Sequence, residues 1–401
     1  MKSRIVLFAA VSVASLITTG ALAQTAGKTA DSKEVEELVV TGSRAEPRSR
    51  LESLAPVDVV TASSLQKRGT TELAAALAAT VPSIDFPRPS NTDGTDSVRP
   101  ATLRGQGPDQ TLVLINGVRG HTSALVNLNG SVGRGSAAVD LNTIPSVAID
   151  RIEVLRDGAS ALYGSDAIAG VINIGLRGVD HGGGASLTYG QRITSFNGLY
   201  GGGGDLKDGA TTTVAGWQGL KLGADGFLTI SGQYRDQNHT NRSDIDPRFT
   251  PAKVRSRFGD GDVEEETLYL NAGKPLGDGW EASAWGGVQE RHSETAATYR
   301  APNDATQNIP SVYPDGYLPL INTHSRDFSV GGGLKGEIAG WKADFSLDYG
   351  WNRLRYGVEH TLNPSLGPTS PHSFYAGEMI YDQTVGNADL TATSTWAWLD
   401  L

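Results

Sequence analysis

The sequence predicts an α+β domain followed by the antiparallel strands of a transmembrane β-barrel that is incomplete within these 401 residues. Three observations lead to this prediction. Residues 144–177 hold two apolar, strand-like runs around a glycine-rich turn system. From Gly182 onward, apolar and polar residues alternate over long runs, as in strands with one apolar and one polar face. Tight turns and long polar loops then follow one another, which is typical of the two rims of a barrel.

The composition excludes several classes of protein and site. The chain has 50 Gly and no Cys, so it contains neither disulfides nor thiolate metal sites. A formal net charge of −10 argues against a nucleic-acid partner, which would call for a basic surface. Beyond the N-terminus, no apolar run reaches the ~18 residues that a membrane helix needs.

The N-terminus has the pattern of a cleaved secretory signal peptide. Lys2 and Arg4 precede the apolar run 5–17, and Ala21-Leu22-Ala23 offers the small residues that signal peptidase accepts. A membrane anchor helix is the alternative, although the run is short for one. We therefore predict a signal peptide over residues 1–23 and an exported protein.

Residues 24–50 are predicted to form a polar tail that contains one β-prone segment, 35–44. An extended segment without a sheet of its own can add to the sheet edge of another protein through main-chain hydrogen bonds. The alternative is that this segment is the first strand of the domain that follows.

Residues 51–178 are predicted to form the compact α+β domain. A strand at 57–60 is followed by helices at 62–66 and 71–79, the second of which stops before Pro82. Asn116-Gly117 predicts a hairpin between strands 111–115 and 118–119. A strand at 149–155 should bury Ile152 and Val154 and direct Arg151 and Glu153 to the opposite face. Gly158, Gly164 and Gly170 indicate positive φ angles or close backbone contacts.

The motifs Leu103-Arg104-Gly105 and Leu112 to Gly117, together with residues 144–177, give the domain a family likeness. In this combination and order, the stretch from about Pro56 to Arg177 resembles the plug domain of TonB-dependent outer-membrane receptors. The resemblance implies a plug inside a large barrel of the Gram-negative outer membrane. It also implies active uptake of a ferric siderophore, haem, cobalamin or an oligosaccharide, energised through the partner protein TonB.

The resemblance also assigns roles to residues. The TonB box, which would bind TonB, is predicted at Glu36, Glu37, Leu38, Val39, Val40 and Thr41. Charged plug residues that would contact the barrel wall are predicted at Arg104, Arg151, Glu153 and Arg156. Ordinary surface ion pairs are the alternative for these four. Ligand contacts are predicted at Arg88, His121 and Arg134. The expected partners are TonB, outer-membrane lipid and a small-molecule or oligosaccharide ligand, and a secreted binding module without transport is the competing function.

No residue pattern predicts an enzyme, a cofactor or a metal site. Gly158-Ala159-Ser160-Ala161 lacks the second glycine of a nucleophile elbow. The seven histidines show no i, i+4 pairing, which argues against a transition-metal site. Asp93-Gly94-Thr95-Asp96 and Asp260-Gly261-Asp262 are expected to be solvated turns rather than calcium loops.

Residues 179–401 are predicted to be the N-terminal part of the barrel. Clear strands occur at 227–235, 267–276, 280–289 and 342–352, with tight turns at 277–279 and 339–340 and long loops at 238–264 and 294–327. A soluble β-sandwich would show the same alternation. We count about eight strands, against the ~22 of plugged transporters. Alternation is lost after Thr391, so we expect a truncated, non-transporting fragment, with a shift of the reading frame as its cause.

Overall fold

The structure is a computed structural model that describes residues 56–67, 70–86, 89–128 and 133–392. Outside these ranges it gives the backbone of two pairs of short strands, β1 (Leu38–Val39) with β2 (Arg48–Ser49) and β20 (Thr395–Trp396) with β21 (Leu399–Asp400). The predicted signal peptide lies outside the described residues. No helix within the described ranges is both long and apolar enough to cross a membrane.

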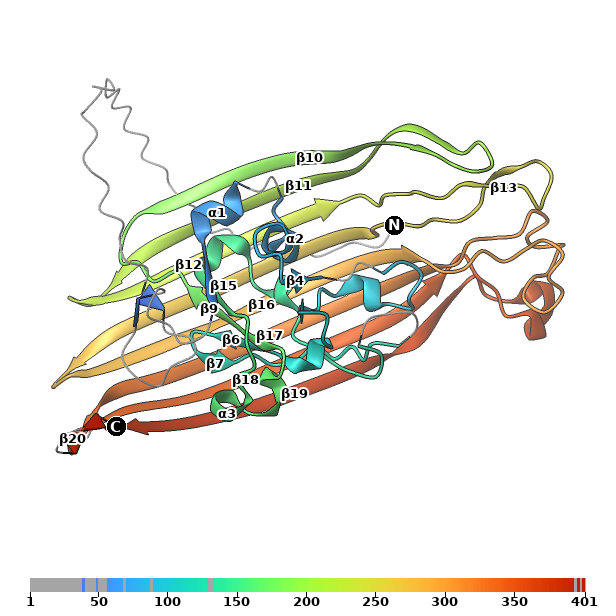
Figure 1. Cartoon of the computed structure of the whole chain (residues 1–401). Helices are drawn as coiled ribbons and strands as arrows, with labels where there is room; N and C mark the ends of the chain where they lie inside the picture. Colours follow the sequence, from blue (N-terminus) through green and yellow to red (C-terminus); the bar gives the residue numbers. More distant parts are fainter. Residues whose placement is uncertain are drawn as a thin grey trace, which may run out of the picture. The chain divides into compact units, whose positions relative to one another are not determined.

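The domain predicted over residues 51–178, which we call the plug, is built on a five-stranded mixed sheet (Figure 1). Its strand order is β3 (Val57–Thr61), β8 (Ile149–Leu155), β9 (Gly170–Leu176), β6 (Thr111–Ile115) and β7 (Val118–Arg119). β6 and β9 are parallel, and the other neighbours are antiparallel. β4 (Ile84–Asp85) and β5 (Thr102–Leu103) form a separate short pair.

Glycine and asparagine shape the turns of this sheet as predicted. Asn116 and Gly117 have φ angles of 51° and 84°, which close the hairpin between β6 and β7. Gly164 has φ of 90°, a region that side chains with a Cβ avoid. At Gly170 a Cβ would lie 2.2 Å from the carbonyl oxygen of Leu155, so the packing of β8 against β9 requires glycine.

Short helices connect the strands and cover the sheet. They are α1 (Ala62–Gln66), α2 (Leu73–Ala78) and α3 (Ser160–Tyr163). Single 3-10 turns lie at η2 (Thr95–Ser97), η3 (Pro108–Gln110), η4 (Leu141–Thr143), η5 (Ser146–Ala148) and η6 (Ser165–Ala167). Thr61 caps α1 by accepting a hydrogen bond from the backbone N–H of Ser64. The helices predicted at 62–66 and 71–79 are thus confirmed, the second with narrower bounds.

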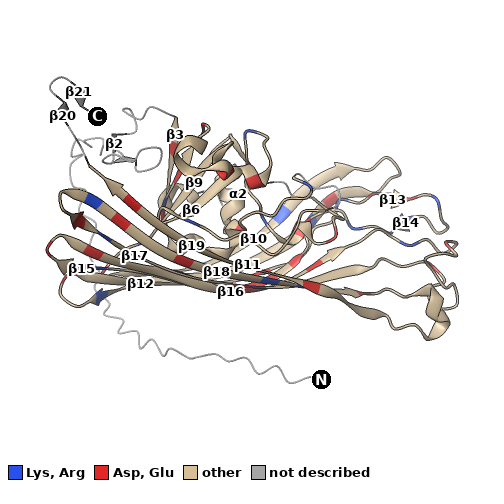
Figure 2. Cartoon of the chain, turned by 90° about the horizontal axis from the view of Figure 1, so that it is seen from below, with Lys and Arg blue, Asp and Glu red and all other residues tan. Residues whose placement is uncertain are grey.

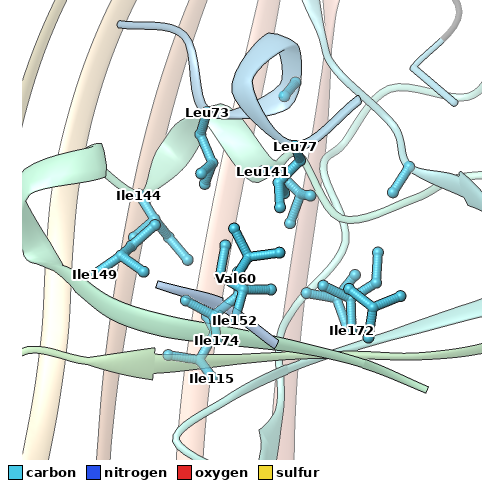
Figure 3. Packing of buried hydrophobic residues seen from close by; sticks show 14 of the residues in the cluster. Val60, Leu73, Leu77, Ile115, Leu141, Ile144, Ile149, Ile152, Ile172 and Ile174 are labelled. Atoms are coloured by element: carbon cyan, nitrogen blue, oxygen red, sulfur yellow. The ribbon is translucent and has the colours of Figure 1, made fainter. Parts of the chain in front are cut away.

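The hydrophobic core of the plug lies between the sheet and α2 (Figure 3). Leu77, Ile149, Ile152 and Ile174 are fully buried there. The prediction that Ile152 and Val154 are buried is confirmed, but Glu153 is also only 1% exposed. Its face of the sheet is covered by a second apolar cluster, which consists of Val57, Leu112, Leu114, Leu155, Ala167 and Val171. Arg151 and Glu153 do share the opposite face, where Arg151 is 44% exposed, but the expectation of one buried face is wrong at Glu153, because the second cluster covers it.

The second half of the chain forms one eight-stranded antiparallel sheet. In order, its strands are β10 (Gly183–Asn197), β11 (Gly203–Leu222), β12 (Gly226–Gln237), β15 (Asp262–Gly277), β16 (Trp280–Ala296), β17 (Leu320–Ile338), β18 (Trp341–Glu359) and β19 (Ser373–Thr391). Since all eight lie in one sheet, with β10 and β19 as its edges, the sandwich alternative is wrong. The strands run for 12 to 20 residues, longer than we predicted.

The turns of this sheet are short at one end and, apart from 198–202 between β10 and β11, long at the other. Asp278 and Ala339 take positive φ angles in the two tight turns, as the sequence indicated. At the other end, loops 238–261 and 297–319 are shorter than predicted, since β16 and β17 extend further into the second one. The first loop carries β13 (Ile245–Asp246) paired with β14 (Lys253–Val254), and a 3-10 segment, η7 (Pro364–Thr369), lies between β18 and β19.

The two faces of the sheet have opposite character. Large apolar residues such as Leu270, Val288, Phe328 and Leu347 are exposed on one face, which we call the outward face. On the other, polar residues including Glu265, Arg291 and Asp348 are buried. Charged residues accordingly occur along the strands as well as in the plug (Figure 2). This is the arrangement of a barrel wall with lipid outside and a polar lumen inside.

Candidate functional site: the polar contact between plug and strands

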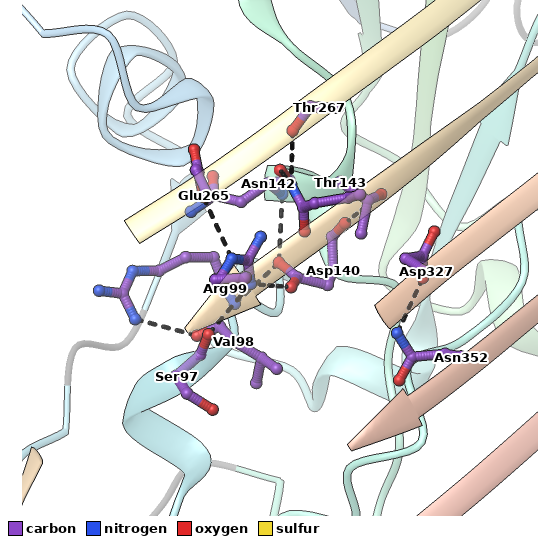
Figure 4. Close-up of polar contacts among 12 residues, drawn as sticks. Ser97, Val98, Arg99, Asp140, Asn142, Thr143, Glu265, Thr267, Asp327 and Asn352 are labelled. Atoms are coloured by element: carbon purple, nitrogen blue, oxygen red, sulfur yellow. Dashed lines mark hydrogen bonds and ion pairs between the residues drawn. The ribbon is translucent and has the colours of Figure 1, made fainter. Parts of the chain in front are cut away.

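Six buried charged residues meet where the plug contacts the sheet. Figure 4 labels three of them, Arg99, Asp140 and Glu265. The plug contributes Glu72, Arg99 and Asp140, and the strands contribute Arg235, Glu265 and Arg291. Each side chain is no more than 8% exposed. We call this set the charged cluster.

Two links cross from the plug to the strands. Arg291 Nη1 donates to Asp140 Oδ2 at 2.5 Å and to the carbonyl oxygen of Ser97 at 3.1 Å. Arg235 Nη1 lies 4.0 Å from Glu72 Oε2. The two strand arginines share Glu265, with Arg235 Nε 3.1 Å from Oε1 and Arg291 Nε 3.1 Å from Oε2. Glu265 therefore couples both links.

Local structure in the plug holds its half of the cluster in place. Asp140 is the N-cap of η4, where its Oδ1 accepts from the backbone N–H groups of Asn142 and Arg99, each at 3.1 Å. Arg99 Nε donates to Glu72 Oε1 at 2.7 Å. Gln289 in β16 also donates to the carbonyl oxygen of Asn142 at 2.6 Å. Asp140 and η4 thus provide both the N-cap and the contact with β16.

The cluster balances three positive and three negative groups. Burial alone would lower the pKa of Arg99, but the neighbouring carboxylates, Glu72 first, raise it above its ordinary value, so the guanidinium stays charged. The free-energy cost of desolvating the charges offsets much of the attraction between them, so buried ion pairs contribute little net stability. Removing one partner is nevertheless costly, because it leaves another charge buried and unpaired.

Asp96 lies beside this cluster and corrects one expectation. We predicted that Asp93-Gly94-Thr95-Asp96 would be a solvated turn, but Asp96 is 8% exposed. Burial raises the pKa of its carboxyl group. The side chain of Tyr356 packs over Gly94, where a Cβ would lie 2.4 Å from a ring carbon of the tyrosine. The turn is thus pressed against β18 rather than open to solvent.

A second polar contact joins the plug to β17 and β18. His121 Nε2 lies 2.9 Å from Asp327 Oδ2, which also accepts from the Asn352 amide at 2.8 Å. Asn352 Oδ1 in turn accepts from the backbone N–H of Ala124 at 2.8 Å. Gly350 leaves room for the imidazole, since a Cβ there would lie 2.1 Å from its Cγ. Burial lowers the pKa of His121, but Asp327 outweighs it and raises that pKa above the ordinary value.

Hydrogen bonds between neutral groups complete the contact. Asn116 donates to Asn271 Oδ1 at 3.1 Å, and Asn271 donates to the carbonyl oxygen of Arg177 at 3.1 Å. The Thr71 and Thr213 hydroxyls lie 2.7 Å apart. The contact is polar at all of these points, although Tyr269 and Trp285 from the strands also pack against the plug core.

The residues predicted to contact the wall have their recorded bonds inside the plug. Arg104 donates to the carbonyl oxygen of Ala169, and Arg151 pairs with Glu153 at 3.0 Å. Arg156 pairs with Asp58 at 2.8 Å. Contacts of these four with a barrel wall therefore stay a prediction. The polar wall contacts described above come from other plug residues, among them the charged cluster, His121 and Asn116.

The predicted ligand and TonB residues are placed only in part. Arg88 lies outside the described residues, and Arg134 is exposed on its loop. His121 is only 7% exposed and bonded to Asp327, so a ligand would reach it only after that contact opened. Of the TonB box, the structure gives only the backbone of Leu38 and Val39, paired with Ser49 and Arg48. Both roles stay predictions.

The sequence did hold a signal for the strand residues of the cluster. Arg235 follows Thr229, Ser231 and Gln233 at every second position, and Glu265 precedes Thr267 in the same way. A charge within such a polar alternation marks the lumen face of a membrane strand. Glu72 and Asp140 carried no comparable signal, because each occupies an ordinary helix-start position.

Comparisons with known proteins now identify the fold. Residues 49–171 match the family model of the TonB-dependent Receptor Plug Domain. The chain therefore contains the plug domain of the TonB-dependent receptors. The solved siderophore receptor PirA from Acinetobacter baumannii has the same fold over 86% of this chain and 46% of its own, with a TM-score of 0.60 at 17% identity. The resemblance predicted from the plug motifs and the predicted fold class are confirmed.

Two curated relatives show how much of a TonB-dependent receptor this chain spans. It is 28% identical to the ferric enterobactin receptor PirA of Pseudomonas aeruginosa over 47% of this chain and 24% of that protein. It is 26% identical to the vitamin B12 transporter BtuB of Photobacterium profundum over 80% of this chain and 49% of that protein. The chain thus spans half or less of these relatives. The family is one of transport receptors rather than enzymes.

Proposed function

We propose that this chain is the plug and N-terminal barrel part of an outer-membrane receptor that takes up a scarce ligand with energy delivered by TonB. The observation that carries the proposal is the charged cluster. Its polar contacts hold the plug against the strands beside smaller apolar contacts, such as those of Val98 and Leu125 with Leu354. Water and alternative partners can replace such contacts, whereas a continuous hydrophobic core would have to be exposed. A plug that must yield to a mechanical pull needs a contact of this kind.

The names of the relatives suggest two ligand classes to test. One is the ferric siderophore class, represented by the ferric enterobactin receptor, and the other is cobalamin, represented by the vitamin B12 transporter. Aromatic rings gather on the long loops, where those of Tyr313 and Tyr317 lie 4.5 Å apart. Arg255 lies over the rings of Phe249 and Tyr299 at 5.5 and 5.7 Å. Arg255 is only 7% exposed and donates to the carbonyl oxygen of Pro251, so it orders the aromatic loop, and the two ligand classes are distinguished by experiment.

The test is ligand accumulation by a complete receptor, in which this chain is followed by the remaining barrel strands, in cells that lack their own receptors for the two probes. Labelled ferric enterobactin and labelled vitamin B12 are supplied separately, with and without a proton uncoupler. Accumulation of either probe that the uncoupler abolishes supports the receptor. Binding at the cell surface without accumulation would instead support the competing function, a binding module without transport.

Deleting residues 36–41 sharpens the same assay. In a complete receptor built on the intact chain, we expect the deletion to leave surface binding nearly unchanged and to abolish uptake, because TonB would pair with this segment through main-chain hydrogen bonds. Val39→Pro should act similarly, since proline removes a backbone donor. Equal uptake by the deletion variant and the intact chain would contradict the TonB assignment. Val35→Ala, just outside the deleted segment, serves as the control.

A further inference from the structure

A second group of ionisable side chains lies on the outward face of β16 and β17, away from the plug. It consists of Glu290, His292 and His324. Their candidate ligand atoms all lie within 4.8 Å of one another. Within the part of the chain that the structure describes, this is the one place where three such ligands converge. We call it the outward triad.

Strand register brings the triad together. His292 in β16 lies directly opposite His324 in β17, so both imidazoles project from the same face of the sheet. The rings stack with centroids 4.1 Å apart and planes inclined by 19°. Glu290 is two residues before His292 and therefore projects from that face as well. The two histidines lie on different strands, so a search for i, i+4 spacing along one segment does not find them.

The position of the triad fits a ligand that arrives from outside the barrel. Val288 and Phe328, which lie opposite each other in β16 and β17, are exposed apolar residues. The next pair on the outward face, toward the end with the long loops, is Glu290 and Arg326, and the triad begins there. Glu290 and His292 are 44% and 55% exposed, and His324 is 24% exposed. The ligand atoms are thus accessible, while the backbone that carries them is held in a rigid ladder.

The distances are close to those of a transition-metal site. Glu290 Oε1 lies 2.7 Å from His324 Nε2 and 3.7 Å from His292 Nε2. Ligands at ~2.0–2.2 Å from a tetrahedral zinc ion are about 3.4 Å apart, so shifts of roughly 1 Å would close the site. Two imidazole nitrogens with one carboxylate favour zinc, copper or nickel over calcium or magnesium, which prefer oxygen ligands.

The surroundings favour a cation. His292 and His324 belong to the lining of a hollow of about 610 Å³, which takes residues from both faces of the sheet. This lining includes five carboxylates and one guanidinium: Asp236, Asp262, Glu264, Glu294, Glu359 and Arg355. Arg326 is the local competitor, since its Nη2 lies 3.2 Å from Glu290 Oε1. Glu290 has a second carboxylate oxygen, which can accept the hydrogen bond from Arg326 while Oε1 binds a metal. Residues that hydrogen-bond to a metal ligand in this way orient that ligand.

We propose that Glu290, His292 and His324 bind one transition-metal ion of the zinc class on the outward face of the barrel wall. The site is separate from the ligand path inside the barrel and does not depend on the uptake function. A bound ion links β16 to β17 at their outer ends, with one coordination position left for water or an anionic oxygen.

Zinc binding to the full chain in detergent micelles tests the proposal by titration calorimetry. We expect one ion per chain, and a Kd raised about tenfold or more in His292→Ala and in His324→Ala. His181→Ala is the matched control, since His181 is exposed and pairs with Asp180. Arg326→Gln should bind as tightly as the wild type or more tightly, because a competing cation is removed.

Copper(II) in place of zinc gives a measurement that needs no variant. Its paramagnetic resonance spectrum should show coupling to two nitrogen nuclei in the wild-type chain. Circular dichroism of each variant checks that the β-structure is retained. A wild-type chain without one saturable site, a copper spectrum with oxygen ligands alone, or an unchanged Kd in both histidine variants would overturn the proposal.

Discussion

The interior of the plug and its contact with the strands are held by different forces. Inside, Leu77, Ile149, Ile152 and Ile174 pack in a continuous apolar core. At the contact, Arg99, Glu72 and Asp140 face Arg235, Glu265 and Arg291 across a set of ion pairs. Buried apolar area gives the plug its own stability. The ion pairs mainly fix how the plug sits, because desolvation offsets much of their attraction.

This difference teaches which part of the molecule can move. A domain with its own core stays folded when its outer contacts are exchanged, and polar contacts can be exchanged for water at modest cost. We therefore expect changes in the charged cluster to alter plug docking and changes in the core to alter plug folding. The following experiments separate these two effects.

The largest effect is expected for Arg291→Met. The substitution leaves Asp140 buried without its arginine partner and Glu265 with Arg235 alone, which should cost about 3–5 kcal/mol of docking free energy. Amide hydrogen exchange should rise in loop 89–100 and η4 while β8 and β9 stay protected. Lys335→Met is the control, since its ion pair with Asp344 is exposed and worth ~0–1 kcal/mol. Equal exchange in both variants would show that the cluster does not hold the plug.

Ile152→Ala should have the next largest effect and the opposite pattern. Ile152 is fully buried, and the cavity left by the change should cost about 2–5 kcal/mol of folding free energy. Exchange is expected to rise throughout β8, β9 and β6. If the plug core stayed protected and only the contact with the strands loosened, the proposed division between the two regions would be wrong.

A backbone test within the plug is expected to be smaller. Gly164→Val places a β-branched residue at φ of 90° and ψ of −173°, which should cost about 1–3 kcal/mol. Ser160→Ala, in the adjacent exposed helix, should change stability by about 0.5 kcal/mol or less. Denaturant unfolding of the two variants measures both values. Similar midpoints would show that the turn does not require glycine.

The smallest effect concerns pH and the second polar contact. The folded pKa of His121 is raised, so its contact with Asp327 is at full strength below the ordinary value of about 6.5. It weakens as the pH rises through the raised folded value. Asp348 and Asp140 also face His121 and act in the same direction. Protection of the Ala124 amide should fall with rising pH, and His121→Gln should remove that dependence beyond the intrinsic change in exchange rate.

Much of the fold was predictable because the signals were local. Asn116-Gly117 specified its hairpin, alternation located the long strands, and the order of the plug motifs indicated the family. The lumen-facing charges Arg235 and Glu265 also lay in a readable polar alternation. Loss of alternation after Thr391 and the expected truncation, by contrast, stay predictions.

The sequence by itself thus determined which segments form strands, turns and the plug, since these depend on neighbours a few residues apart. Only the tertiary structure decided which charges meet. Asp140 and Arg291 are separated by 151 positions, and Glu153 is buried by a second apolar layer that no local pattern announced. The stacked His292 and His324 likewise come from different strands. Contacts across a sheet depend on register and on what covers each face, and neither is encoded within one element.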